Sequence, residues 1–175
     1  MTLYDNIYEL ASENFGLITT AQARVNGISK DELGKLRARG KLERIGHGVY
    51  RIKYHVPSIL DVYADAVALV GHEAYVLGES VLAMLNLASV NPNSIYIGTT
   101  KRVRKKLPDY IKVIQRHTND ETTFYDGIPC MTVAAAIRYC SGKVMPERLM
   151  EALLDGVREG YITKRELDAI SKELK

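Results

Sequence analysis

Basic side chains crowd into one short stretch of this chain, and the chemistry open to such a cluster is the binding of phosphate groups. Residues 29–53 hold eight Lys and Arg side chains against three Asp and Glu, a net charge of +5, although the whole 175-residue chain carries only +3. Residues 1–28 carry −2, and the rest of the chain balances at zero. A local positive excess of this kind is typical of a nucleic-acid-binding surface. The plainer alternative is a solvated, charged helix face.

The first part of this stretch has the pattern of a short helix. Ser29 and Glu32 have the capping-box spacing, which satisfies free N–H groups at a helix start. Leu33 and Leu36 fall on one helical face, so they predict the side that packs into a core. Gly40 can adopt the left-handed conformation that ends a helix.

A β-hairpin is predicted directly after this helix, and two further helices are predicted before it. Residues 42–45 and 49–52 read as strands, joined through a turn that contains Gly46 and Gly48. Residues 3–14 have helical spacing of apolar side chains, and a short helix after Thr19 or Thr20 ends at the Asn26-Gly27 turn. Helices joined by a tight Gly-containing turn match a helix-turn-helix, and the hairpin makes it winged.

In a winged helix-turn-helix, the third helix enters the major groove of DNA and the wing reaches a neighbouring groove or the backbone. We therefore expect the DNA-binding residues to lie on that helix and on the hairpin. They are Ser29, Lys30, Gly34, Lys35, Arg37, Ala38, Arg39, Lys41, Arg44, His47 and Arg51.

The overall prediction is an α+β protein with two domains, a winged helix-turn-helix over 1–54 and a mixed α/β domain over 58–175. The second domain is expected to have a small sheet and C-terminal helices, because strand-like alternation is followed by helical spacing. Its predicted strands are 74–77, 94–99, 111–117, 122–125 and 128–131, and its predicted helices are 58–70, 80–87, 133–140, 146–158 and 164–174.

A second basic cluster follows the predicted strand 94–99 and precedes Pro108. It consists of Lys101, Arg102, Arg104, Lys105 and Lys106. Such a cluster on a loop can extend a nucleic-acid surface, contact an RNA-like or acidic partner, or simply be solvated.

No catalytic or metal-binding pattern is evident, and we predict a protein that is not an enzyme and needs no cofactor or metal. Ser80 lies in Gly-Glu-Ser-Val-Leu, which lacks the final glycine of a nucleophile elbow. Pro108-Asp109 is compatible with the start of a restriction-type nuclease core, but no acidic-x-Lys follows on the next strand. The side chains that can bind zinc or form a thiol–imidazole pair are scattered along the chain, at His72, His117, Cys130 and Cys140.

The chain also lacks features of secreted and membrane proteins. No apolar run approaches the roughly 18 residues that span a bilayer, and the N-terminal residues show no secretory signal. The two cysteines give no disulfide pattern. We therefore expect a reduced, cytoplasmic protein that does not bind membranes.

The whole chain resembles the AbiEi-type antitoxins of bacterial abortive-infection, type IV toxin–antitoxin systems. The segment at 15–52, FGLITTAQARVNGISKDELGKLRARGKLERIGHGVYRI, carries the more specific part of the resemblance. YVLGESVLAMLNL at 75–87, GIPCMTVAAAIRYC at 127–140 and the helical end are similar more loosely.

The resemblance implies a winged-helix domain that binds an inverted-repeat operator in double-stranded DNA and represses its own operon. It also implies a C-terminal domain that opposes a nucleotidyltransferase-like toxin without forming a stable complex with it. Members of the wider family also occur without a toxin.

Two other functions stay open from the residues themselves. The winged helix can be a scaffold in a stand-alone regulator or in a protein- or RNA-interaction module, because a fold does not fix a function. An enzyme acting on nucleic acid is the third hypothesis, which the missing catalytic set disfavours.

Overall fold

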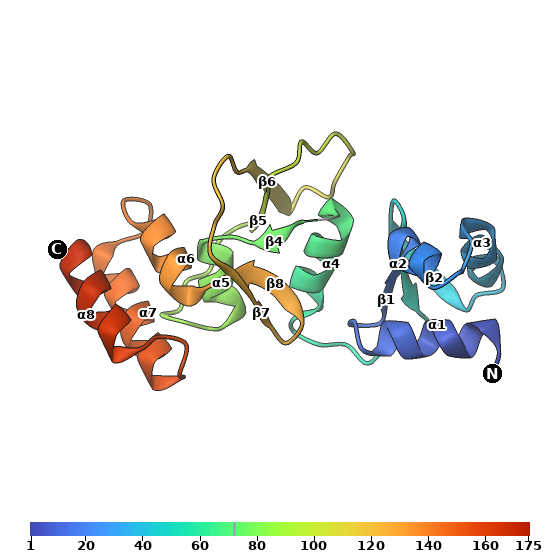
Figure 1. Cartoon of the computed structure of the whole chain (residues 1–175), viewed down its shortest axis with the longest axis horizontal. Coiled ribbons are helices and arrows are strands. Elements are labelled where there is room, and N and C mark those ends of the chain that lie inside the picture. Colours follow the sequence, from blue (N-terminus) through green and yellow to red (C-terminus); the bar gives the residue numbers. More distant parts are fainter. Residues whose placement is uncertain (72) are drawn as a thin grey trace. The chain divides into compact units, whose positions relative to one another are not determined.

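The computed structural model describes residues 1–71 and 73–175, and the chain divides into two compact units, Met1–His72 and Glu73–Lys175 (Figure 1). His72, which was considered above as a zinc ligand, lies outside the described residues. The protein has a mixed α+β fold with small sheets and C-terminal helices, as predicted. None of the helices in the described part of the chain has the length and apolarity needed to cross a membrane.

The first unit contains short helices packed around a small antiparallel sheet. Its elements are α1 (Leu3–Ser12), β1 (Leu17–Thr19), α2 (Thr20–Val25), α3 (Lys30–Ala38), β2 (Leu42–Gly46), β3 (Val49–Ile52) and α4 (Asp61–Val70). Their core is a single cluster that includes Ile7, Ile18, Leu33, Leu42 and Tyr50. One side chain from almost every element thus reaches the same core.

The cap predicted for α3 is present. The Ser29 N–H donates to Oε2 of Glu32 at 2.7 Å, and the Glu32 N–H donates back to the Ser29 hydroxyl at 3.2 Å. The hydrogen bond from the Ser29 N–H lowers the pKa of the Glu32 carboxyl. Gly40 has φ +70° just beyond the end of α3, as its expected role requires. The start and the end of this helix are therefore fixed by local sequence.

Strand β1 is absent from the elements predicted above, and this is a correction. Residues 17–19 pair with β3 in antiparallel register, with Leu17 opposite Arg51 and Thr19 opposite Val49. The sheet order is β1-β3-β2. A strand of three residues is too short to show alternation, and its partner lies more than 30 residues further along the chain.

Helix α4 begins later than predicted and belongs to the first unit rather than to the second. Ser58 does not cap it: the Ser58 N–H donates to Oδ2 of Asp61 at 3.2 Å, and the helix starts at Asp61. Asp65 of α4 forms an ion pair with Arg51 of β3. The boundary between the units thus follows α4, whereas the predicted boundary lies at residues 54–58.

The second unit is built on a mixed sheet with helices after it. Its elements are β4 (Tyr75–Val76), α5 (Glu79–Met84), β5 (Ile95–Thr99), β6 (Ile111–Gln115), β7 (Thr122–Tyr125), β8 (Ile128–Met131), α6 (Val133–Cys140), α7 (Pro146–Arg158) and α8 (Lys164–Glu173). The strand order is β6-β5-β4-β8-β7, with β5 parallel to β6 and β4 parallel to β8.

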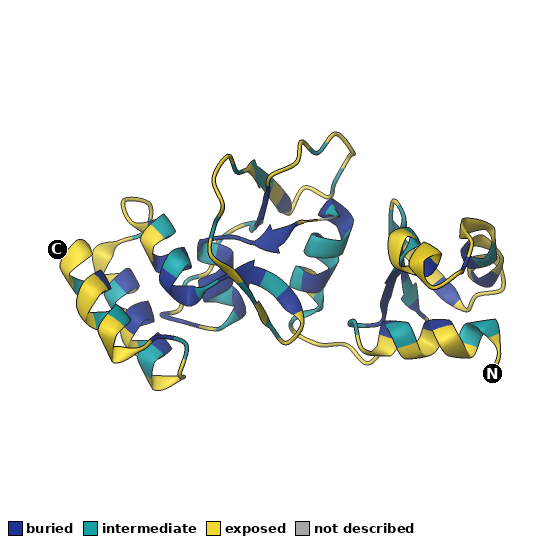
Figure 2. Cartoon of the chain, in the orientation of Figure 1, coloured by how far each residue is buried: buried dark blue, intermediate teal, exposed yellow. Residues whose placement is uncertain are grey.

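In the second unit, burial is greatest at the centre of the sheet. The central strands β4 and β8 are almost wholly buried, whereas the loop between β5 and β6 is largely exposed (Figure 2). Helices α6, α7 and α8 pack against one another at the C-terminal end, and α5 packs against α6 and β5. The central strands and the inner faces of α5, α6 and α7 therefore form the buried part of this unit.

Candidate nucleic-acid interface

Helix α3 has one buried face and one open face. Leu33 and Leu36 are 0% and 7% exposed, and they anchor the helix on the core of the first unit. At 100° per residue, the side of the helix opposite the two leucines carries Gly34, Lys35 and Ala38, and Lys30 lies at the edge of that side. These four predicted groove-facing residues are exposed.

The cations of α3, of the turn after it and of β2 form no ion pair with the acidic side chains in the described part of the chain. No ion pair within the described residues involves Lys30, Lys35, Arg37, Arg39, Lys41 or Arg44. All six side chains belong to exposed residues. Positive charge that is neither buried nor neutralised stays available to a phosphate group.

The hairpin presents two of its predicted contact residues to solvent. Arg44 is exposed beside a β-bulge in β2, and its Nε donates to the carbonyl oxygen of Gly46 at 3.1 Å. His47 is exposed in the turn between β2 and β3. Gly48, which follows it, has φ +69°, so the turn depends on this glycine. The conformation of the hairpin turn is thus set by the positive φ of Gly48 and by the hydrogen bond from Arg44 to Gly46.

Arg51 differs from the other predicted contact residues, because its guanidinium is already occupied. It pairs with Asp65, and its Nε also donates to the carbonyl oxygen of Phe15 at 3.4 Å. The side chains of Arg51 and Asp65 are only 17% and 18% exposed. Arg51 therefore holds α4 and β1 on the sheet, and the structure does not present it with the open cations.

Asp31 was missed among the groove-facing residues. It is exposed, and helical spacing places it between Gly34 and Lys35 on the open face of α3. A carboxylate at such a position can accept a hydrogen bond from the amino group of cytosine. The spacing alone was sufficient to find it, but a search for positive charge passes over an acidic residue.

Gly34 lies in the middle of α3 without an internal reason for being glycine. A Cβ atom built on it has no atom within 4 Å, and its φ is not in the left-handed region. Glycine in an exposed helix interior costs about 1 kcal/mol relative to alanine. Packing inside the protein does not explain this cost, whereas close approach of a ligand to the helix would.

Comparison with known proteins identifies the segment that carries these residues. Residues 5–53 match the family described as transcriptional regulator, AbiEi antitoxin. The resemblance seen in the sequence is thereby confirmed for this AbiEi-like segment, which contains α2, α3 and the hairpin. No curated protein sequence matches the chain.

The fold of the chain is similar to that in the crystal structure of the RV2827C protein from Mycobacterium tuberculosis. The TM-score is 0.51 at 15% sequence identity, and the match covers 97% of this chain and 71% of that chain. At this identity the likeness concerns the fold alone. It extends beyond the AbiEi-like segment into the second unit.

The second basic cluster lies in the second unit, on the connection between β5 and β6. Lys101, Arg102, Arg104, Lys105 and Lys106 are exposed. Lys101 is paired with Glu73, with 3.5 Å between Nζ and Oε1. This cluster is separate in sequence from the AbiEi-like segment.

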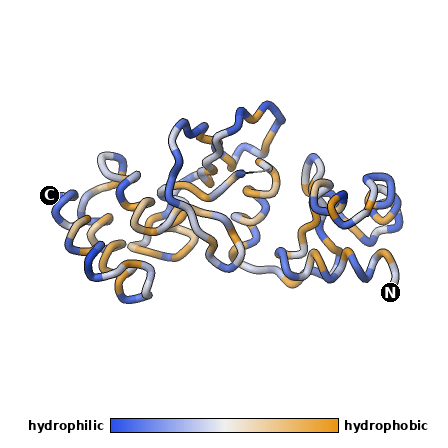
Figure 3. Tube along the Cα trace, viewed as in Figure 1, coloured by the Kyte–Doolittle hydropathy of each residue, from blue (hydrophilic) through white to orange (hydrophobic). Residues whose placement is uncertain are grey.

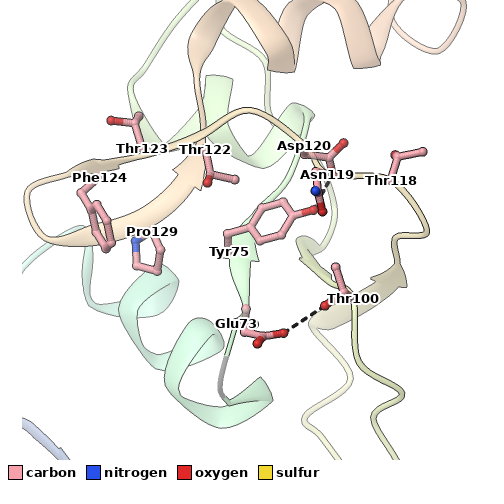
Figure 4. A pocket seen from close by; sticks show the side chains of 11 residues that line it. Glu73, Tyr75, Thr100, Thr118, Asn119, Asp120, Thr122, Thr123, Phe124 and Pro129 are labelled. Carbon is pink, nitrogen blue, oxygen red and sulfur yellow. Dashed lines mark hydrogen bonds between the residues drawn. The ribbon is translucent and has the colours of Figure 1, made fainter.

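The second unit also contains an open pocket of about 520 Å³ whose lining includes Glu73, Tyr75, Thr100, Asp120 and Phe124 (Figure 4). Its carboxylates are already engaged. Oε2 of Glu73 accepts a hydrogen bond from the Thr100 hydroxyl at 3.0 Å, and Asp120 accepts one from the Tyr75 hydroxyl. The acidic groups in the wall of this pocket are thus already hydrogen-bonded within the unit.

Asp120 is further fixed by Arg116. The guanidinium donates two hydrogen bonds to it, at 2.8 and 2.9 Å, and these lower the pKa of the Asp120 carboxyl. Burial and the neighbouring carboxylate raise the pKa of the Tyr75 hydroxyl. Asp120 is thus held ionised and Tyr75 protonated, which suits a structural network.

The two cysteine thiols and Asp109 are not part of a metal-binding group in the described residues. Burial raises the pKa of Cys130 and of Cys140 to about 12, so both thiols stay protonated. Asp109 is exposed before β6. The described residues contain no group of three His, Cys, Asp or Glu side chains placed to hold a metal ion.

Proposed function

We propose that the protein is a DNA-binding transcriptional regulator whose first unit is a winged helix-turn-helix. In this proposal α2 and α3 are the helix-turn-helix, α3 is the recognition helix, and the β2–β3 hairpin is the wing. One observation carries it: exposed cations that form no ion pair among the described residues gather between Lys30 and Arg44, inside a segment that matches a family of transcriptional regulators.

The proposed contacts fall into two classes with different consequences. Base edges in the major groove meet the open face of α3, where Lys30 and Lys35 donate hydrogen bonds and Asp31 accepts them. Phosphates meet Arg37, Arg39 and the hairpin residues Lys41, Arg44 and His47, which supply affinity that falls as salt rises. Ser29 contributes by capping the helix that presents these groups.

The test of this proposal uses the double variant Lys35→Ala/Arg39→Ala. In a gel-shift assay on the DNA immediately upstream of the protein's own reading frame, we expect at least a hundredfold loss of affinity, since one base contact and one phosphate contact disappear. Lys164→Ala/Lys172→Ala removes two exposed lysines of α8 and serves as the control. Unchanged affinity of the first variant, with an unchanged melting curve, would overturn the assignment of α3 and favour an interaction module.

The finer function proposed is that of an autoregulating repressor and antitoxin acting in the cytoplasm. The operator is an inverted repeat in double-stranded DNA, and the functional partner is a nucleotidyltransferase-like toxin that need not bind the antitoxin. The family description for residues 5–53 supports this proposal. The second unit, which that match does not include, is the proposed seat of the antitoxic activity.

The same double variant separates these two activities in cells. Co-expressed with a neighbouring nucleotidyltransferase-like gene, Lys35→Ala/Arg39→Ala is expected to protect the cell while derepressing a reporter placed behind the upstream DNA. Loss of both effects together would place the antitoxic activity in the DNA-binding unit. Absence of protection by the unmodified chain would favour a stand-alone regulator.

A further inference from the structure

The connection between β5 and β6 carries the second basic cluster, and we call residues 101–106 the basic loop. Five of its six residues are Lys or Arg, and all five are exposed. In Figure 3 the loop between β5 and β6 is marked by hydrophilic positions. Like charges gathered on one loop repel one another, so their juxtaposition stabilises nothing inside the unit.

The basic loop belongs to a connection that bridges the length of a strand and is longer than a tight turn. Strands β5 and β6 are parallel neighbours, with Ile95 opposite Ile111 and Thr99 opposite Gln115. The connection must therefore run back along the full length of a strand of five residues, which is roughly 17 Å at about 3.3 Å per residue. Its cations are thus successive residues of a long connection and not the corner of a tight turn.

Both ends of the connection are fastened to the sheet. At the start, the Lys101 N–H donates to the hydroxyl of the buried Thr99 at 3.1 Å. At the far end, the Ile111 N–H donates to the carbonyl oxygen of Pro108 at 3.0 Å. Val103 and Leu107 are partly buried between these ends. The backbone therefore has fixed points from which the charged side chains extend.

Most of the charge on the basic loop is not neutralised within the unit. Lys101 pairs with Glu73, but no ion pair among the described residues involves Arg102, Arg104, Lys105 or Lys106. This contrasts with the other arginines of the second unit that pair with carboxylates, such as Arg116 and Arg138. Four open cations within five consecutive residues suit a ligand that carries several anionic groups.

We propose that the basic loop is a second, sequence-independent contact to the phosphate backbone of duplex DNA. Phosphates of one strand succeed one another every ~3.4 Å along the helix axis, so a loop with several open cations can face more than one of them. Single-stranded nucleic acid is bound largely through stacking on aromatic rings, and the basic loop contains none. The choice of duplex DNA as the polyanion rests on the proposed function of the first unit.

The experiment measures how binding of the full chain to DNA depends on salt. The probe is a fluorescent 30-bp duplex of random sequence, and anisotropy gives its affinity at several NaCl concentrations. Each lost phosphate contact lowers the slope of log K against log salt by about 0.9. For Arg102→Ala/Arg104→Ala/Lys105→Ala/Lys106→Ala we expect a slope lower by about 2 to 4 and at least tenfold weaker binding at 100 mM NaCl.

A matched variant removes the same amount of charge elsewhere in the same unit. Lys164→Ala/Arg165→Ala/Lys172→Ala/Lys175→Ala also deletes four exposed cations, on and just after α8, and none of them forms an ion pair among the described residues. We expect this variant to bind the random duplex with nearly the slope of the unmodified chain. Equal losses in both variants would mean that net charge alone acts, and this would overturn the proposal.

Further comparisons distinguish the role of the basic loop from the proposed role of α3, and duplex DNA from other polyanions. One outcome is that Lys35→Ala/Arg39→Ala keeps full affinity for the upstream DNA while the loop variant has a lower slope of log K against log salt. This outcome would overturn the proposed role of α3 and leave the proposed role of the basic loop intact. An unchanged slope in the loop variant overturns the loop whatever the helix variant does. A larger loss on a 30-nucleotide single-stranded RNA or on polyglutamate than on the duplex would also overturn it, in favour of an RNA or an acidic protein partner.

Discussion

The two units of this protein differ in where their positive charge is placed. In the first unit, the cations of α3 and β2 are exposed on a helix and a strand that are held by a shared core. In the second unit, three arginines pair with carboxylates: Arg116 with Asp120, Arg138 with Glu173 and Arg158 with Asp155. The exposed cations of that unit that form no ion pair among the described residues include those of the basic loop and of α8.

This difference leads to a hypothesis about function. Whether a cation forms an ion pair in the folded protein indicates its role better than its membership of a basic cluster in the sequence. Arg51 and Arg44 lie seven residues apart in the same hairpin, yet one is paired and largely buried and the other is exposed. An ion pair that is partly shielded from water stabilises the fold, whereas an open cation on a rigid element contributes little until an anion arrives. The predictions below test this division.

The largest effect is expected from Gly34→Leu, which alters the open face of α3 without touching the core. The free protein has room for a side chain there, and leucine is a better helix former than glycine by roughly 0.8 kcal/mol. Its stability should therefore stay the same or rise. Against a DNA groove the same side chain clashes, so we expect affinity for the upstream DNA to fall about a hundredfold, or ~2.7 kcal/mol.

The matched control is Ala169→Leu, which adds a bulky side chain to an exposed position of α8 in the second unit. It should leave DNA affinity unchanged in the same gel-shift assay. If Gly34→Leu also binds normally, α3 does not approach a ligand closely at this position, and the open face loses its proposed role.

A somewhat smaller effect, on stability instead of binding, is expected from Asp120→Asn in the second unit. The variant breaks two charge-assisted hydrogen bonds from Arg116, so urea unfolding followed by circular dichroism should show a loss of about 2 kcal/mol at pH 7. Because Arg116 lowers the pKa of Asp120, the carboxylate stabilises the fold fully above its unfolded pKa of about 3.9.

The sign of the pH dependence follows from that direction. As pH falls below about 4 and passes through the folded pKa, Asp120 is protonated and its contribution disappears. The difference in stability between the unmodified chain and Asp120→Asn should thus shrink at pH 3. DNA affinity at pH 7 should not change, because this network is not part of the proposed interface. A constant difference down to pH 3 would mean that the ionised carboxylate is not what stabilises the unit.

Features set by neighbouring residues were predictable from the sequence. The cap of α3 at Ser29 forms as the spacing indicates. Thr163 and Glu166 have the same spacing and cap α8 in the same way. Asp126 and Gly127, an Asp-Gly pair between two strands, adopt the positive φ values of 49° and 78° that such a hairpin turn needs. In each case the signal and the structure lie within a few residues of each other, so no distant partner decides the outcome.

Features set by distant partners were not predictable. Residues 17–19 form strand β1 because they pair with β3, which lies far along the chain. The parallel pairings of β5 with β6 and of β4 with β8 have no signature in the local sequence. The same limit applies to the candidate interface. Helical spacing identifies the open face of α3, but the partner that occupies Arg51 is Asp65, on a helix that the sequence assigns to the other domain.

The smallest effect compares Arg44→Gln with Arg51→Gln inside the hairpin. Arg44→Gln removes an open cation, so we expect about fivefold weaker DNA binding, or ~1 kcal/mol, and a salt slope lower by about 0.9. Arg51→Gln removes the partner of Asp65 and is expected to lower the free energy of unfolding by about 1 kcal/mol while leaving the salt slope unchanged. Asp65→Asn is its control, because it breaks the same ion pair without removing a cation. If Arg51→Gln lowers the slope as much as Arg44→Gln does, its ion pair opens on DNA, and pairing in the free protein does not decide which cations bind.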